Sequence, residues 1–152
     1  MLYRMVAASA LFSCVLFAGT AGAQAGDPTL AKQIADATAK ARTGKTLTIR
    51  TQGAWDLVPL ICKADPDRMD GRTVSSLISL LDSPDDSVRA YTAGAIGCLG
   101  PRGKPAVPTL LRLLPAADCL NGTITSAGFI RTALKRIGVT PPPAPTCKTI
   151  GG

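Results

Sequence analysis

The sequence predicts an all-helical fold, a short α-solenoid of about three antiparallel helical hairpins that ends in a proline-rich tail. Two observations carry this prediction: apolar residues recur with the period of a helix, and the pattern of one hairpin occurs twice along the chain. Residues that favour helix starts and ends separate the periodic segments. The 152 residues divide into an export signal (1–25), a degenerate N-terminal hairpin (26–71), two repeats (72–138) and the tail (139–152).

The clearest hairpin spans residues 72–100. Ser83 and Pro84 indicate where its second helix starts, because serine is a favoured N-cap and proline suits the first helical position. Asp85 and Asp86 then fall in the first turn, where carboxylates interact favourably with the helix dipole. The first helix is predicted from the apolar stripe Val74, Leu77, Ile78 and Leu81. The second is predicted from Val88, Tyr91 or Thr92, Ala95 and Leu99, with Gly100 placed to end it.

The same pattern recurs directly afterwards. The first-helix stripe matches, at a constant offset of 33 residues, Val107, Leu110, Leu111 and Leu114. At an offset of 38, the second-helix residues Tyr91, Ala95, Ile96, Leu99 and Gly100 match Phe129, Ala133, Leu134, Ile137 and Gly138. The difference between the offsets predicts a five-residue insertion in the turn of the second hairpin, at residues 115–125.

One stretch resembles a known repeat family. That stretch reads Leu-x-x-Leu-Leu-Asp-Ser-Pro-Asp-Asp-Ser-Val-Arg, followed by Ala-x-Ala-Ile-Gly-x-Leu-Gly. It is similar to the short HEAT-like repeat also found in bilin lyase proteins. The similarity is clearest from Val74 to Gly100, weakens towards Gly138 and covers about half of the chain. It implies a protein-binding scaffold without catalytic residues. It also implies that Arg89 joins a polar contact between repeats, with an aspartate from residues 65–86 as its partner.

The preceding segment, residues 26–71, is predicted to be a degenerate hairpin that caps the open end of the stack, because two hairpins are too few to bury a solenoid core. Helical spacing and start signals predict one helix from Asp27 to Ala41 and another from Trp55 to Lys63. Trp55 is expected to anchor the core. Between the two helices, alternating residues in 43–53 indicate a short exposed strand, and a plain loop is the alternative.

Residues 1–25 have the features of a secretory signal peptide. Arg4 precedes an apolar run, and small residues end the segment at Ala21-Gly22-Ala23-Gln24-Ala25. The run is shorter than the ~20 residues that a membrane span needs. The protein is therefore expected in the periplasm or outside the cell, beginning near Gln24 or Gly26. Lipoprotein processing at Cys14 is an alternative that fits the surrounding residues less well.

Four cysteines remain after the predicted signal. An even number in an exported chain indicates two disulfides, and three pairings are open. Hairpin topology favours Cys62 with Cys98, because both would lie near the C-terminal ends of neighbouring parallel helices. The tail, at ~3.3 Å per extended residue, is long enough to bring Cys147 back to Cys119.

Neither a metal site nor catalysis is predicted. The chain has no histidine and no Cys-x-x-Cys pair, which are the usual parts of zinc sites and acid–base catalysis. Residues 65–71 lack the spacing of a calcium loop, since Met69 stands at a ligand position and the chain contains no glutamate. No cofactor is expected.

Charge is distributed unevenly along the chain. The net charge is +7, and without Arg4 there are 16 basic residues against 10 acidic ones. From residue 101 onwards the chain contains seven basic residues and one acidic residue, Asp118. Six of them are predicted to form a basic strip that contacts a partner: Arg102, Lys104, Arg112, Arg131, Lys135 and Arg136.

These features predict an exported module that binds another protein, most simply an acidic one, or acts as a scaffold. The alternative is an envelope-surface protein that recognises an anionic polymer or lipid through its basic C-terminal half. Nucleic acid is not expected as a partner, because the protein is exported and poor in aromatic residues. The sequence leaves the oligomeric state open.

Overall fold

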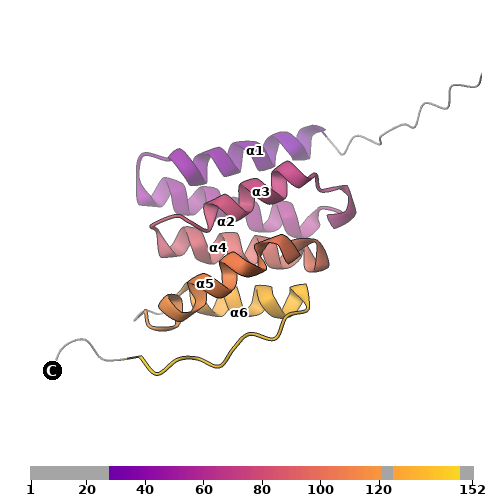
Figure 1. Ribbon diagram of the computed structural model, residues 1–152. Coiled ribbons are helices and arrows are strands. Elements are labelled where there is room, and N and C mark those ends of the chain that lie inside the picture. Colours follow the sequence, from indigo (N-terminus) through magenta and orange to yellow (C-terminus); the bar gives the residue numbers. More distant parts are fainter. Residues whose placement is uncertain (1–27, 121–124, 148–152) are drawn as a thin grey trace, which may run out of the picture.

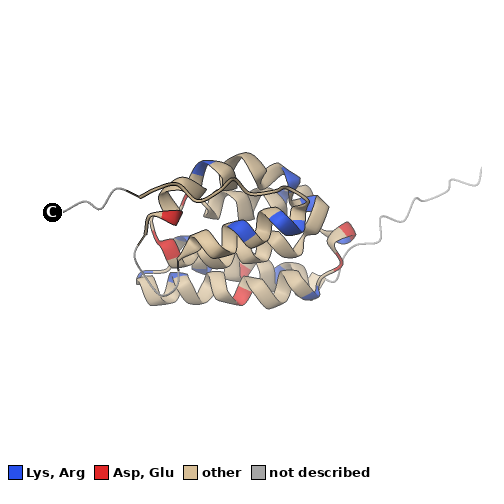
Figure 2. Ribbon diagram, turned by 90° about the horizontal axis from the view of Figure 1, so that it is seen from below, with Lys and Arg blue, Asp and Glu red and all other residues tan. Residues whose placement is uncertain are grey.

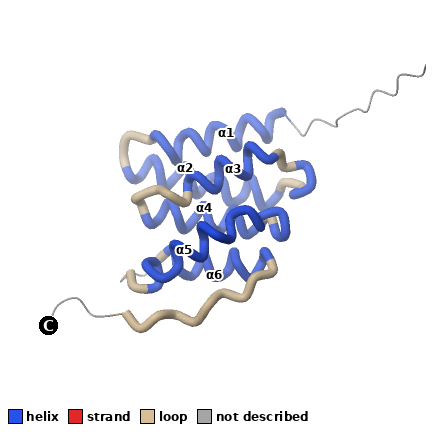
Figure 3. Tube along the Cα trace, viewed as in Figure 1, coloured by secondary structure: helices blue, strands red, loops and turns tan. Residues whose placement is uncertain are grey.

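The computed structural model describes residues 28–120 and 125–147 (Figure 1). In these ranges the chain forms helices and no strand (Figure 3). The helices are α1 (Pro28–Thr43), α2 (Leu47–Lys63), α3 (Gly71–Leu80), α4 (Asp86–Cys98), α5 (Val107–Asp118) and α6 (Ser126–Ile137), with the short 3-10 helices η1 (Pro66–Arg68) and η2 (Gly100–Ala106). The predicted signal peptide and Cys14 lie outside the described residues. In the part that is described, no helix is both long and apolar enough to cross a membrane.

The six α-helices form two layers. Helices α2, α4 and α6 lie side by side, with α4 packed against both of the others. Helices α1, α3 and α5 run along the opposite side, each in contact with the next helix in the chain (Figure 1). The arrangement confirms the predicted all-helical fold.

The core lies between the layers and contains residues from every hairpin. Leu77 and Leu110, the equivalent positions of the two repeats, are both fully buried, as predicted. In α4 it is Thr92 that is fully buried in the core, whereas Tyr91 is partly buried. Leu111 departs from its predicted stripe, because 37% of its surface is exposed.

The contact between α1 and α2 depends on a glycine that sequence periodicity does not single out. A Cβ atom on Gly53 would lie 2.4 Å from the backbone nitrogen of Ala41 and 2.9 Å from the carbonyl oxygen of Ala37. The backbone atoms of α1 cannot move aside as a flexible side chain could, so only glycine at position 53 allows the two helices to come this close. The first hairpin is therefore held by close backbone packing where its helices cross.

The strand predicted within residues 43–53 is wrong. Helix α2 begins at Leu47, and the Thr46 side chain caps it by accepting a hydrogen bond from the Ile49 amide at 3.3 Å. Leu47 and Ile49 are both exposed, so their alternation reflects two apolar residues at a helix surface. The cap, rather than the short alternation, determines the local structure.

Two predicted helix boundaries also need correction. Helix α4 starts at Asp86 with Asp85 as its N-cap, because the Ser83 hydroxyl instead accepts the Asp85 amide in a turn at 3.2 Å. Helix α5 continues through Pro115 to Asp118, so the turn of the second hairpin begins later than residue 115. Pro115 lies on the exposed side of α5, where water can satisfy the carbonyl that its missing N–H leaves free.

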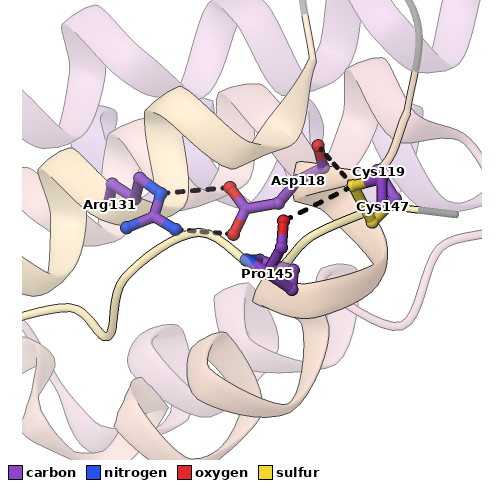
Figure 4. The surroundings of a disulfide bond; sticks show 5 residues. All are labelled: Asp118, Cys119, Arg131, Pro145 and Cys147. Atoms are coloured by element: carbon purple, nitrogen blue, oxygen red, sulfur yellow. Dashed lines mark hydrogen bonds and ion pairs between the residues drawn. A yellow bond between two sulfur atoms is a disulfide. The ribbon is translucent and has the colours of Figure 1, made fainter.

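Two disulfides join the chain in the pairing that topology favours. Cys62 is bonded to Cys98 and Cys119 to Cys147, with Cα–Cα distances of 4.9 and 5.3 Å. The second bond ties the tail to the end of α5 (Figure 4). The tail therefore runs back along the last hairpin and covers the end of the stack (Figure 1).

Arg131 holds the tail at a second point. Its guanidinium donates to both carboxylate oxygens of Asp118, at 3.0 and 2.6 Å, and to the Pro142 carbonyl at 2.6 Å. The hydrogen bond to Asp118 raises the pKa of Arg131. The Cys119–Cys147 bond lies beside this ion pair (Figure 4).

Truncating either repeat-equivalent leucine should destabilise the fold. Leu77→Ala and Leu110→Ala should each lower the free energy of unfolding by ~2–5 kcal/mol, because each leaves a cavity in a sealed core. Leu111→Ala, at a position on α5 where 37% of the surface is exposed, serves as the control and should lower it by no more than ~1 kcal/mol. Urea unfolding with the disulfides intact measures all three. Equal effects at Leu77, Leu110 and Leu111 would show that the helices are packed in a different register.

The disulfides should be complete in the native protein. Cys62, Cys98, Cys119 and Cys147 are expected to resist alkylation until a reductant is added, as measured by intact mass. The double variant Cys62→Ser/Cys98→Ser should lose ~4 kcal/mol of stability, because the bond closes a loop of 36 residues. Two alkylated thiols in unreduced protein, or an unchanged unfolding midpoint in the double variant, would contradict the pairing.

Candidate functional site

A row of three aromatic rings crosses the outer face of the α2–α4–α6 layer. Trp55 on α2 meets Tyr91 on α4 with ring centroids 4.9 Å apart, and Tyr91 meets Phe129 on α6 at 5.6 Å. Both pairs are edge-to-face, with interplanar angles of 88° and 74°. This geometry is favourable for aromatic quadrupoles. Each ring comes from the second helix of a different hairpin, so the row follows directly from the order of the helices. We call these three residues the aromatic row.

Trp55 is not the core anchor that its sequence context predicts. Its side chain is 54% exposed, whereas Leu57 and Ile61 on the same helix are buried. The buried face of α2 is already filled by these residues and by Ala54, which leaves Trp55 on the outer face. A signal for this was present in the repeat pattern, because Tyr91 and Phe129 are matched residues and Trp55 precedes Tyr91 by 36 positions.

The aromatic row lies in a groove of about 670 Å³. Small residues on α4 and α6, including Gly94, Gly97, Gly128 and Ala133, line it together with the rings. A Cβ atom on Gly97 would lie 3.0 Å from the Cα of Ala133, so glycine lets the two helices approach closely. Gly128 has no neighbour within 4 Å of an added Cβ, so its missing side chain leaves the groove open.

The two ends of the groove differ in chemistry. At the C-terminal end of α6, Arg136 is the one charged residue among those that line it. Towards the N-terminal end of α2, a second hollow of about 550 Å³ shares Trp55 and Tyr91 and is otherwise lined by Leu47, Thr48, Thr51 and Gln52. The surface is therefore apolar in the middle, uncharged at one end and basic at the other.

Polar contacts fix the N-terminal ends of the same three helices. Arg50 of α2 donates to the Asp85 carboxylate at 2.6 Å, and this hydrogen bond raises the pKa of Arg50. Asp86 of α4 accepts the Ser126 amide of α6 at 2.9 Å and also bonds to the Ser126 hydroxyl. Asp86 thereby supplies the acceptor that the α6 N-cap, Thr125, does not provide. These bonds therefore link the start of α2 to the start of α4, and the start of α4 to the start of α6.

Arg89 takes part in these contacts in a different way from the one that the family resemblance implies. Its guanidinium bonds to Asp86 at 2.8 Å and to the carbonyl oxygens of Ser83 and Pro84, all within its own hairpin. The bond to the next hairpin is made by Asp86. Arg89 thus positions the carboxylate that spans the hairpins.

Figure 2 shows basic residues on several helices. Of the six residues of the predicted basic strip, three donate to oxygen atoms elsewhere in the chain: Arg102 to the Met69 carbonyl, Arg112 to Asp82, and Arg131 to Asp118. Arg136 lines the groove, whereas Lys104 and Lys135 are exposed outside it. In the described ranges, acidic residues and cysteines form no cluster of three or more suited to a metal ion.

No family model, curated protein or solved structure matches the chain. The geometry of the groove and its residues therefore carry the functional argument.

Removing the shared carboxylate should loosen the last hairpin. Asp86→Ala deprives the Ser126 amide and Arg89 of an acceptor, and should cost ~1–2 kcal/mol of stability. Asp36→Ala is the control, because in the described part of the chain that exposed carboxylate pairs with Lys32 one turn away, and its loss should cost less than ~0.5 kcal/mol. Thermal unfolding compares the two variants. Equal effects would mean that Asp86 does not hold α6.

Proposed function

We propose that the chain is an exported HEAT-like repeat module that binds another protein through the groove of the α2–α4–α6 layer. Three consecutive helical hairpins and the residues from Val74 to Gly100 support the repeat assignment. Two disulfides support export, because such bonds persist in oxidising compartments.

The exposed aromatic row is the observation that carries this proposal. Tryptophan and tyrosine dominate the binding energy of many protein interfaces, because they bury a large area for little loss of conformational entropy. The chain has one tryptophan, and more than half of its surface faces solvent beside Tyr91 and Phe129. An interaction surface explains this placement better than folding does.

The groove favours binding over catalysis. Its lining contains one charged side chain, Arg136, and otherwise apolar residues, glycines and the hydroxyls of Tyr91, Thr125 and Thr132. A general acid or base that titrates near neutral pH is not among these residues. The proposal accordingly assigns no reaction and no cofactor to the chain.

The alternative, an envelope-binding protein that uses a basic strip, receives less support. Arg131 and Arg112 each pair with an aspartate, and Arg131 also holds the tail. Charges that are neutralised within the chain contribute little to attraction of an anionic surface.

Site-specific cross-linking tests the proposal. A photo-cross-linking amino acid replaces Thr132, an exposed residue in the groove, or Leu111, an exposed residue on α5 outside it. In the producing cells, the Thr132 position should yield a discrete protein adduct that Trp55→Ala abolishes, and the Leu111 position should not. The same adduct from both positions, or an adduct that Trp55→Ala leaves unchanged, would refute binding through the groove.

A further inference from the structure

We infer that the groove binds a short acidic peptide segment of the partner, with apolar side chains on the aromatic row and a carboxylate on Arg136. This inference rests on the proposed function and specifies the chemistry of the partner. It follows from the length of the groove, from the shape of its apolar part and from the bonding state of Arg136.

The length of the groove fits a short segment. Its lining residues run along α6 from the N-cap, Thr125, to Arg136, which at ~1.5 Å per residue corresponds to ~16 Å. An extended peptide covers ~3.3 Å per residue, so about five residues fill this distance.

The apolar part of the groove has an uneven surface. Neighbouring rings are turned nearly perpendicular to each other, so edges and faces alternate along the row. Branched aliphatic and proline side chains suit such a surface, because their compact shapes fit between rings that stand at different angles. Gly128 brings the backbone of α6 to the groove lining with open space beside it, which leaves room for a peptide main chain, whereas the space beside Gly94 is filled by the Phe129 ring.

Arg136 is available to a carboxylate. Its hydrogen bond within the described residues goes to the Cys98 sulfur at 3.6 Å, and sulfur is a weak acceptor. By contrast, Arg50, Arg89 and Arg131 each pair with an aspartate of the chain. A guanidinium can bind a carboxylate through two parallel hydrogen bonds, which gives both orientation and affinity. Among the described residues, Arg136 thus has no carboxylate partner, and it lies at the end of the groove.

A second role of Arg136 must be separated from peptide binding. Basic residues in the last turn of a helix stabilise it through the helix dipole, and Lys135 shares that position with Arg136. Only Arg136 lines the groove, whereas both side chains are exposed. Lys135 is therefore a matched control, with similar charge, exposure and helix position.

Defined peptides test the inference. Fluorescein-labelled heptapeptides carry five positions drawn from Leu, Val, Pro, Ala and Gly, followed by two Asp. A matched set ends in two Asn, and every peptide of both sets has an amidated C-terminus, so that the Asn set carries no carboxylate at this end. Anisotropy titration uses the full disulfide-bonded chain. Members of the Asp set should bind, and their Asn counterparts should bind about tenfold more weakly or worse. Added salt should narrow this difference, because it screens the contact with Arg136.

The variants locate the contacts. Trp55→Ala should weaken both peptide sets by about tenfold, whereas Arg136→Glu should weaken only the Asp set by a similar factor. Arg136→Gln, which removes the charge without reversing it, should have a smaller effect. Lys135→Glu and Leu111→Ala should change the affinity by less than about twofold. Unfolding midpoints verify that each variant is folded.

Four results would overturn the inference. Equal binding of the Asp and Asn sets would exclude a carboxylate contact, and an equal loss from Lys135→Glu and Arg136→Glu would indicate a diffuse basic field. Trp55-dependent binding to phosphatidylglycerol vesicles without peptide binding would indicate a lipid surface. If no peptide binds while Trp55→Ala still abolishes the cross-link at Thr132, the partner chemistry is wrong but the groove remains the binding site.

Discussion

The structure depends most on the close packing of backbones between neighbouring helices. Gly53 meets Ala37 and Ala41 where α2 crosses α1, and Gly97 meets Ala133 where α4 crosses α6. Larger residues at these points would separate the helices and open the core between the layers. The close approach of α4 and α6 at Gly97 accompanies the ring contact between Tyr91 and Phe129, which lie on these two helices. Trp55 meets Tyr91 across the separate contact between α2 and α4. The aromatic row therefore depends on how closely the three helices of this layer pack.

The α2–α4–α6 layer is also fixed at both of its ends. Polar bonds join the helix starts, from Arg50 to Asp85 and from Asp86 to Ser126, and the Cys62–Cys98 disulfide joins α2 to α4 where they end. A surface that is held in this way loses little conformational entropy when a partner binds. Rigidity thus links the stability of a small helical stack to its proposed use as a binding surface.

Much of the fold could be predicted from the sequence, whereas little of the site could. Apolar spacing is dictated by burial, so Leu77 and Leu110 were identified correctly, and topology favoured both disulfides. The start of a helix is harder to predict. Both Ser83 and Asp85 are suitable N-cap residues for α4, and only the packed structure shows which of them takes that position. The roles of Gly53 and Gly97 depend on backbone distances between helices, which the sequence does not show. The roles of Arg112 and Arg131 depend on aspartate partners that lie 30 and 13 residues away in the chain. Trp55 was misassigned because a large apolar residue at helical spacing is usually buried, and periodicity does not show which face a neighbouring helix covers.

The central claim is that the stack presents Trp55 to solvent at the head of a rigid aromatic row. Because the chain has one tryptophan, its fluorescence reports on this position alone. Acrylamide quenching of the native, disulfide-bonded protein is the most direct test. The account predicts red-shifted emission that acrylamide quenches readily, close to that of the unfolded chain. Blue-shifted emission that resists acrylamide until the protein unfolds would show that Trp55 is buried, and would contradict both the groove and the function proposed for it.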